Sequence, residues 1–199
     1  AAVAAQGEVV LSLERMNRLL GFNAEERALT VEAGMITAEV QRHAAEQGLL
    51  YGVDFASAGS CTIGGNVATN AGGIKVIRYG MTREQVLGLM VVDGRGEVLA
   101  LNRGLLKNNT GPDLRHLFVG SEGILGIVTE VTLALRKPAG PLGVMLLAVR
   151  DFVSILDVLR VFAGGLTLSA FEFFGHNGLQ RVLAQLQRAA PLAADAPFY

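Results

Sequence analysis

Strand-like and helix-like patterns alternate along the first part of the chain. Short apolar runs predict strands at residues 8–13 and 28–34, the second of which ends in a glycine. Between them and the glycine-rich region, apolar side chains recur every four residues over 36–48, as they do in a helix with one buried face. We expect Thr37 to cap this helix and Gly48 to end it.

The patterns between residues 86 and 135 are typical of antiparallel strands. Two apolar runs flank Asp-Gly-Arg-Gly at 93–96, which predicts a hairpin because aspartate and glycine tolerate positive φ. A short helix is expected at 113–119, and apolar and polar residues alternate over 124–135 as in a half-buried strand. The fold class predicted for this region is therefore α+β.

The pattern changes after residues 136–141, where two prolines and a glycine indicate a linker. We predict two domains, at 1–139 and 140–199, of which the second is only begun. The second is expected to contain strands at 144–149 and 168–174 and helices at 152–165 and 178–190.

Composition and charge narrow the classes of partner. A net charge of -1 with 51% hydrophobic residues gives neither the basic excess of a nucleic-acid-binding protein nor the polarity of a disordered chain. The single cysteine, Cys61, excludes an internal disulfide and favours a reducing compartment, most simply the cytoplasm. No apolar run reaches the length of a membrane-spanning helix, and peripheral association with the inner membrane face stays open.

The histidines do not form a recognisable site. His43, His116 and His176 lie in separate segments without shared spacing, so neither a metal site nor a catalytic triad is expected from them. We therefore predict no metal ligand and assign no catalytic residue within this sequence.

Residues 56–73 hold five glycines and no carboxylate, histidine or lysine. Glycine permits close backbone approach, and with Thr62 as a helix cap this segment can direct several backbone N–H groups at one point. Asn66 and Asn70, four residues apart, would add side-chain donors and acceptors on one helical face, suited to a phosphate or a polar ring edge. The alternative is a tightly packed loop without a ligand.

Two common nucleotide motifs are absent from the sequence. Neither the phosphate-loop pattern GxxxxGK[ST] nor a GxGxxG between a strand and a helix occurs. These absences disfavour a P-loop nucleotide hydrolase and a Rossmann dehydrogenase.

Three motifs in order carry a resemblance to a known family. They are SAGSCTIGGNVATNAGGIKVIRYG at 57–80, VLGLMVVDGRGEVL at 86–99 and LLKNNTGPDLRHLFVGSEGILGIVTEVTLAL at 105–135. In this order they closely resemble the FAD-linked oxidase family that includes D-lactate dehydrogenase, the glycolate oxidase flavin subunit and D-2-hydroxyglutarate dehydrogenase. The likeness covers about residues 8–137.

The resemblance implies a flavin-binding domain of the vanillyl-alcohol-oxidase or PCMH type, followed by the beginning of a ferredoxin-like cap domain. It implies bound FAD, with the first motif lining the flavin and the GSEG motif lying against the nucleotide. The cofactor-binding residues implied are Cys61, Thr62, Gly64, Gly65, Asn66, Thr69, Asn70, Gly72, Gly73, Tyr79, Glu122, Gly123, Gly126, Ile127 and Val128.

Several residues in and after these motifs have more than one interpretation. Lys75 and Arg78 can meet a substrate carboxylate or can be solvated loop cations, and Tyr79 can be a packing residue. Glu122 can fix its own loop or reach the cofactor. Some distant relatives link flavin to cysteine, but a free cysteine is usually a small buried side chain, so we expect Cys61 to leave FAD noncovalent.

The family pattern is incomplete in this sequence. The phosphate loop that precedes the first matched strand in the family is absent, as is the histidine-rich motif of the cap, and both ends look cut. The resemblance implies oxidation of a small D-2-hydroxy acid by hydride transfer to flavin N5, with an unknown electron acceptor: a quinone, a cytochrome, an electron-transfer flavoprotein or oxygen. We expect the fragment alone to be inactive, and a homo-oligomer or multi-subunit oxidase is open. The alternative is a noncatalytic flavin-fold subunit or binding module.

Overall fold

The computed structural model describes residues 4–102, 104–193 and 195–199 and divides the chain into two compact units, Ala1–Pro138 and Ala139–Tyr199. Within the described residues, the first unit holds a five-stranded antiparallel sheet in the order β1-β2-β5-β3-β4. The strands are β1 (Leu19–Asn23), β2 (Ala28–Glu32), β3 (Val86–Asp93), β4 (Val98–Leu101) and β5 (Gly126–Ala134). The helices of this unit are α1 (Thr37–Glu46), α2 (Ile63–Thr69), α3 (Val76–Tyr79), α4 (Thr82–Gln85) and α5 (Arg115–Phe118).

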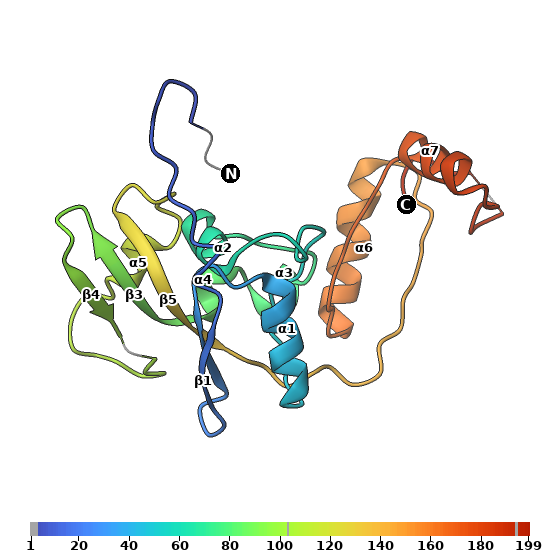
Figure 1. The fold of residues 1–199 in the computed structure, drawn as a ribbon. Helices are drawn as coiled ribbons and strands as arrows, with labels where there is room; N and C mark the ends of the chain where they lie inside the picture. The colour runs from blue at the N-terminus through green and yellow to red at the C-terminus, as the bar shows by residue number, and fades with distance from the viewer. Residues whose placement is uncertain (1–3, 103, 194) are drawn as a thin grey trace. The chain divides into compact units, whose positions relative to one another are not determined.

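The last strand in sequence, β5, lies at the centre of the sheet (Figure 1). Val131 pairs with Val31 of β2 on one side and with Leu89 of β3 on the other. Val128, Val131 and Leu133 are buried while intervening residues are half-buried, so the alternating strand predicted here is confirmed.

The predicted hairpin is confirmed at β3 and β4. The Oδ1 atom of Asp93 accepts the backbone N–H groups of Arg95 at 2.8 Å and Glu97 at 2.9 Å, while Gly96 supplies a φ of +83°. A short side-chain acceptor at the first position of the turn and a glycine near its last position are typical of such hairpins.

The core lies between the sheet and helices α1 and α2. Val40 and Ala44 of α1 and Ile63 and Val67 of α2 are completely buried in the same cluster as Val131. α2 packs directly against β5, which brings the glycine-rich segment onto the central strand.

The start of α1 differs from the prediction. Ile36 occupies the cap position, and Thr37 is the first helical residue, so the predicted cap is wrong. The Thr37 hydroxyl instead forms tertiary hydrogen bonds with Cys61 and Asn66, which occupy its lone pairs and proton. The predicted end is confirmed, because Gly48 follows the helix with a φ of +67°.

The strand predicted at 8–13 is wrong, and β1 is the strand that the pattern missed. Val9 is 94% exposed, and residues 8–13 pair with no strand in the described part of the chain. The open edge of β2 is taken by β1, in which Leu19 pairs with Val31. The alternation of apolar residues indicates that a segment favours an extended form. Strand pairing also depends on which extended segment lies beside the open edge of β2 in the folded chain.

A buried carboxylate ties the chain before β1 to the end of β2. The Glu32 side chain is 6% exposed and accepts the Arg18 guanidinium at 2.8 Å and the Arg18 backbone N–H at 2.8 Å. These two donors, of which the guanidinium is the larger influence, hold the pKa of Glu32 below its ordinary value of 4.5.

We expect this carboxylate to make stability depend on acid pH. Its pKa is lower folded than unfolded, so its contribution is present above about pH 4.5 and is lost as pH falls through the folded pKa. Urea unfolding of wild type and Glu32→Gln at pH 7, 5, 4 and 3 measures this. The difference between the two proteins should be largest at pH 7 and should shrink toward pH 3; a constant difference would contradict the expectation.

The second unit contains helices α6 (Phe152–Gly165) and α7 (His176–Leu186), so both helices predicted there are confirmed. Asp151 caps α6 by accepting the Ser154 backbone N–H at 2.8 Å. The predicted strands at 144–149 and 168–174 are absent from the described residues, and isolated bridges join Phe198 to Val149 and to Gly175 instead. Two extended segments without further strands form no stable sheet.

Two searches of the described residues bear on function. No helix among them is long and apolar enough to cross a membrane. Nor do they contain a group of three or more histidine, cysteine, aspartate or glutamate side chains that could hold a metal ion.

Candidate functional site

The glycine-rich segment forms α2 with the predicted cap. Thr62 precedes the helix, and its Oγ1 accepts the Gly65 backbone N–H at 3.3 Å. The N–H groups of Ile63 and Gly64, however, donate to the carbonyls of Met35 and Ala33 at 2.9 and 2.7 Å. The expectation that the start of this helix directs free N–H groups at a ligand is therefore wrong, because the neighbouring strand end uses them.

The two asparagines form hydrogen bonds within the protein, and only Asn66 lies in the helix. Asn66 is buried, and its Nδ2 donates to the Thr37 hydroxyl at 2.7 Å. Asn70 ends α2 in the left-handed region, with a φ of +48°, and its Oδ1 accepts the Arg83 backbone N–H at 2.9 Å. The polar side chains of the two asparagines are thus used in different contacts within the first unit.

Thr37, Cys61 and Asn66 form one small network under this segment. The Thr37 hydroxyl accepts from Asn66 and lies 3.1 Å from the Cys61 sulfur and 3.3 Å from the Cys61 carbonyl oxygen. Cys61 is thus engaged with a neighbouring side chain, and it is half-buried.

Replacing Thr37 by valine is expected to lower the free energy of unfolding by about 1 to 3 kcal/mol, because a buried amide donor of Asn66 loses its acceptor. Valine keeps the shape of threonine, so packing changes little. Urea unfolding measures the loss, with Thr37→Ser as the control that retains the hydroxyl. Equal stability of the valine and serine variants would show that the network is not stabilising.

Unpaired backbone donors lie just after α2. Within the described residues, the N–H groups of Gly72 and Gly73 donate to no protein acceptor, although both residues are half-buried. An added Cβ on Gly73 would lie 2.0 Å from the Asp54 carbonyl oxygen, so only glycine fits there. Gly73 is therefore packed closely against Asp54, while its N–H group and that of Gly72 have no acceptor among the described residues.

The second glycine motif lies against the first. The Gly120 and Glu122 N–H groups donate to the carbonyls of Val67 and Ala68 at 2.9 and 2.8 Å, which are near the end of α2. Gly120 and Gly123 have φ of +85° and +83°, which the GSEG sequence accommodates. Glu122 itself is exposed, with a φ of +53°.

The candidate cations follow directly after Gly73. Lys75 pairs with Asp54 at 2.7 Å, with about 30% of each side chain exposed, at 28% and 29%. The Arg78 guanidinium lies over the Tyr79 ring, 5.4 Å from its centre. Tyr79 also packs on Gly52, where an added Cβ would lie 2.7 Å from the Tyr79 Cβ.

The remaining predicted residues support the segment or the strand. Gly64 and Gly126 allow close approach, since added Cβ atoms would lie 2.9 Å from the Ala33 Cβ and 2.7 Å from the Val92 carbonyl oxygen. The Thr69 hydroxyl donates to the Gly65 carbonyl at 2.9 Å. Ile127 is 39% exposed and Val128 is buried, as expected for adjacent positions of β5.

Sequence reasoning missed the residues that bond to this segment from elsewhere. Asp54 pairs with Lys75, Arg83 bonds to Asn70, and Tyr51 and Gln85 are completely buried behind it. Burial raises the pKa of the Tyr51 hydroxyl; the nearby Thr82 hydroxyl acts in the opposite direction, although the two do not reach hydrogen-bond geometry. No local pattern marks these partners, because their contacts depend on the fold.

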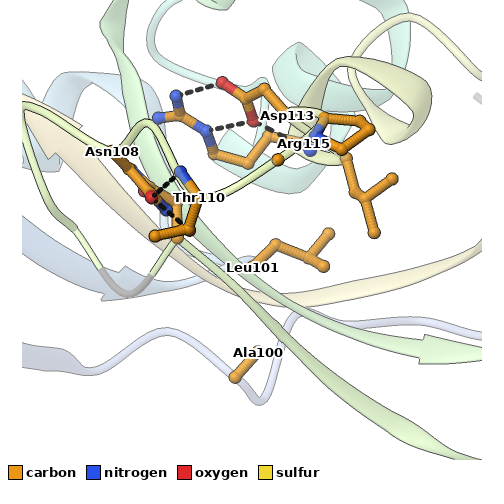
Figure 2. Close-up of a pocket in the computed structure, with 10 residues that line it drawn as sticks. Ala100, Leu101, Asn108, Thr110, Asp113 and Arg115 are labelled. Carbon is orange, nitrogen blue, oxygen red and sulfur yellow. Dashed lines mark hydrogen bonds and ion pairs between the residues drawn. The ribbon is translucent and has the colours of Figure 1, made fainter.

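A separate hollow lies beside the edge strand β4 (Figure 2). Its volume is about 160 Å³, and none of the predicted site residues line it. Figure 2 shows Asp113 and Arg115 paired, and Arg115 holds the pKa of Asp113 below its ordinary value. Thr110 donates to Asn108 from both its backbone N–H and its hydroxyl. The polar side chains that line this hollow are therefore bonded to one another.

Comparison with known proteins decides the family. The FAD binding domain family matches residues 1–102, which is half of the chain and includes the glycine-rich segment. The chain belongs to the FAD binding domain family. The family resemblance and the fold class predicted from the sequence are confirmed, and the family supports FAD as the cofactor.

Members of this family with curated names match the whole chain. D-2-hydroxyglutarate dehydrogenases of Xanthomonas citri pv. viticola and Stutzerimonas stutzeri are 58% and 52% identical over 100% of it, which is 42% and 43% of their own lengths. A mitochondrial D-2-hydroxyglutarate dehydrogenase of Bos taurus is 39% identical over 96% of the chain and 36% of its own length. The chain thus spans less than half of each relative.

A solved structure is similar to this chain over part of its length. Alkyldihydroxyacetonephosphate synthase matches 62% of this chain and 22% of its own, with a TM-score of 0.55 and 29% identity.

The FAD binding domain offers the kind of surface that this cofactor needs. FAD joins a flat ring with a polar edge to a diphosphate, so its site requires close backbone approach and N–H donors more than charged side chains. The available N–H groups of Gly72 and Gly73 meet that requirement.

Proposed function

We propose that the chain is the flavin-binding part of an FAD-dependent dehydrogenase that oxidises a D-2-hydroxy acid, with D-2-hydroxyglutarate as the substrate. The pair of unpaired N–H groups at Gly72 and Gly73, beside a second glycine motif, is the observation that carries a flavin site. The substrate rests on the relatives, which bear that name at 58% and 52% identity over the whole chain.

In this proposal the segments 62–73 and 120–127 line the cofactor, and the N–H groups of Gly72 and Gly73 donate to it. Bound FAD supplies the hydride acceptor for C2 of the hydroxy acid. Lys75 and Arg78, directly after Gly73, are the cations that we assign to the substrate carboxylate. The Cys61 sulfur, 3.1 Å from the Thr37 hydroxyl, has a protein partner, which supports noncovalent binding.

The same proposal gives roles to the two units. Residues 1–139 belong to the flavin-binding domain, and residues 140–199 belong to the substrate-binding cap. The free cysteine supports the cytoplasm as the location. The acceptor that reoxidises the flavin is a quinone, a cytochrome, an electron-transfer flavoprotein or oxygen, and the choice among them is left open.

Two measurements test the proposal. Quenching of FAD fluorescence during titration measures cofactor binding by the 199-residue chain and by a chain extended to the length of its relatives. Dye reduction by the extended chain with D-2-hydroxyglutarate, L-2-hydroxyglutarate, D-lactate and glycolate measures substrate choice. We expect tighter FAD binding by the extended chain and turnover of the D-2-hydroxyglutarate; absence of FAD binding by both chains would favour a noncatalytic module.

A further inference from the structure

The short helix α4 contacts the loop that carries the unpaired glycine donors. The backbone N–H and the hydroxyl of Thr82 both donate to the Ala71 carbonyl, at 2.9 and 2.7 Å. The next residue, Arg83, donates its backbone N–H to Asn70 at 2.9 Å. Together these three hydrogen bonds fix the start of the loop 70–79.

The other end of the loop is held by the same helix. Gln85 is completely buried, and its Nε2 donates to the Tyr79 carbonyl. The N–H groups of Gly72 and Gly73 therefore lie on a loop whose two ends are both bonded to α4.

The Arg83 side chain contacts the residues directly before the second glycine motif, which begins at Gly120. Its Nη2 donates to the Val119 carbonyl at 2.5 Å, and its Nη1 donates to the His116 carbonyl at 3.0 Å. The same Nη1 lies 3.1 Å from the His116 Nδ1, which must accept because a guanidinium only donates. Gly120 follows directly, and an added Cβ there would lie 3.3 Å from Nη2.

This use of a guanidinium differs from an ion pair. Within the described ranges no carboxylate lies at ion-pair distance from Arg83. Its charge is directed at carbonyl oxygens in the four residues before Gly120, while its backbone holds Asn70. One residue thus bonds to Asn70 in the first motif and to the residues directly before the second motif, about 50 positions away in sequence.

We propose that Arg83 is a positioning residue for FAD, which holds the loops 70–79 and 116–123 in the relative arrangement that the cofactor requires. The inference rests on the proposed FAD site. Lysine keeps the charge but presents one nitrogen, which does not span the Val119 and His116 carbonyls as the planar fork does.

The experiment compares wild type with Arg83→Lys and with Arg95→Lys, an exposed arginine in the β3–β4 turn that serves as the matched control. It uses the chain extended to the length of its relatives and measures FAD affinity by fluorescence quenching and global stability by urea unfolding. Amide hydrogen exchange of Gly120 and Glu122, measured without FAD, reports whether the second loop stays on α2.

For Arg83→Lys we expect FAD binding to weaken by about tenfold or more and both amides to exchange about tenfold faster. The urea midpoint should move much less, and Arg95→Lys should leave all three measurements unchanged. Unchanged exchange and unchanged FAD affinity in Arg83→Lys would overturn the inference. If wild type binds no FAD, the proposed function fails. The exchange measurement still tests Arg83 in that case, because faster exchange in Arg83→Lys supports its role in holding the loop and unchanged exchange contradicts it.

Discussion

Replacing Gly73 by alanine is expected to cost about 3 kcal/mol of unfolding free energy, the upper part of the range for an overpacked site. The added Cβ would lie 2.0 Å from the carbonyl oxygen and 2.7 Å from the carbonyl carbon of Asp54, and backbone atoms yield little. The Asp54 carbonyl also accepts the Ile74 N–H at 2.9 Å, so moving the two chains apart breaks that bond.

The same change should also weaken binding of the cofactor. Separation from Asp54 moves the Gly72 and Gly73 N–H groups and disturbs the Lys75 ion pair, so we expect FAD affinity to fall by about tenfold or more, or at least 1.4 kcal/mol. Thermal unfolding and FAD titration measure the two effects separately.

Gly59→Ala is the matched control for this variant. Gly59 belongs to the same glycine-rich segment, but an added Cβ there meets nothing within 4 Å and its φ is not positive. It should leave stability and FAD affinity close to wild type. A similar loss in both variants would mean that glycine content, and not the contact with Asp54, controls the segment.

The second large effect is expected in the core. Leu133 is completely buried on the central strand β5, where it pairs with Leu29 on one side and Val86 on the other. Leu133→Ala should lower the free energy of unfolding by about 2 to 5 kcal/mol, because it removes buried methyl groups and leaves a cavity.

Urea unfolding measures this loss, and Leu20→Ala provides the comparison. Leu20 lies on the edge strand β1 and is 40% exposed, so truncation there removes less buried area. We expect a change of about 0.5 kcal/mol or less for Leu20→Ala. Equal losses for the two variants would contradict the placement of the core on β5.

Local chemistry predicted the elements whose signals lie within a few residues. The Asp-Gly-Arg-Gly turn, the Thr62 cap and the alternation of β5 each act over one turn or one strand, and the structure contains all three. The same holds for α6 and α7, where helical periodicity was sufficient.

Tertiary contacts account for the misses. Residues 8–13 and β1 are both able to form a strand, and only the partner edge on β2 distinguishes them. The N–H groups of Ile63 and Gly64 were expected to face a ligand. They donate instead to the Met35 and Ala33 carbonyls, which lie about 30 positions earlier in the sequence. The ion pair of Lys75 with Asp54 spans 21 positions and leaves no periodic signal.

The central position of β5 also sets the order of folding. β1 with β2 and β3 with β4 are antiparallel pairs of neighbours in sequence, whereas β5 joins Ala134 to Ala28 across about 100 residues. On a ribosome, both hairpins emerge before β5, so the sheet closes only after residue 134 has been synthesised. Until then the inner edges of β2 and β3 are open, and pairing between two nascent chains competes with closure.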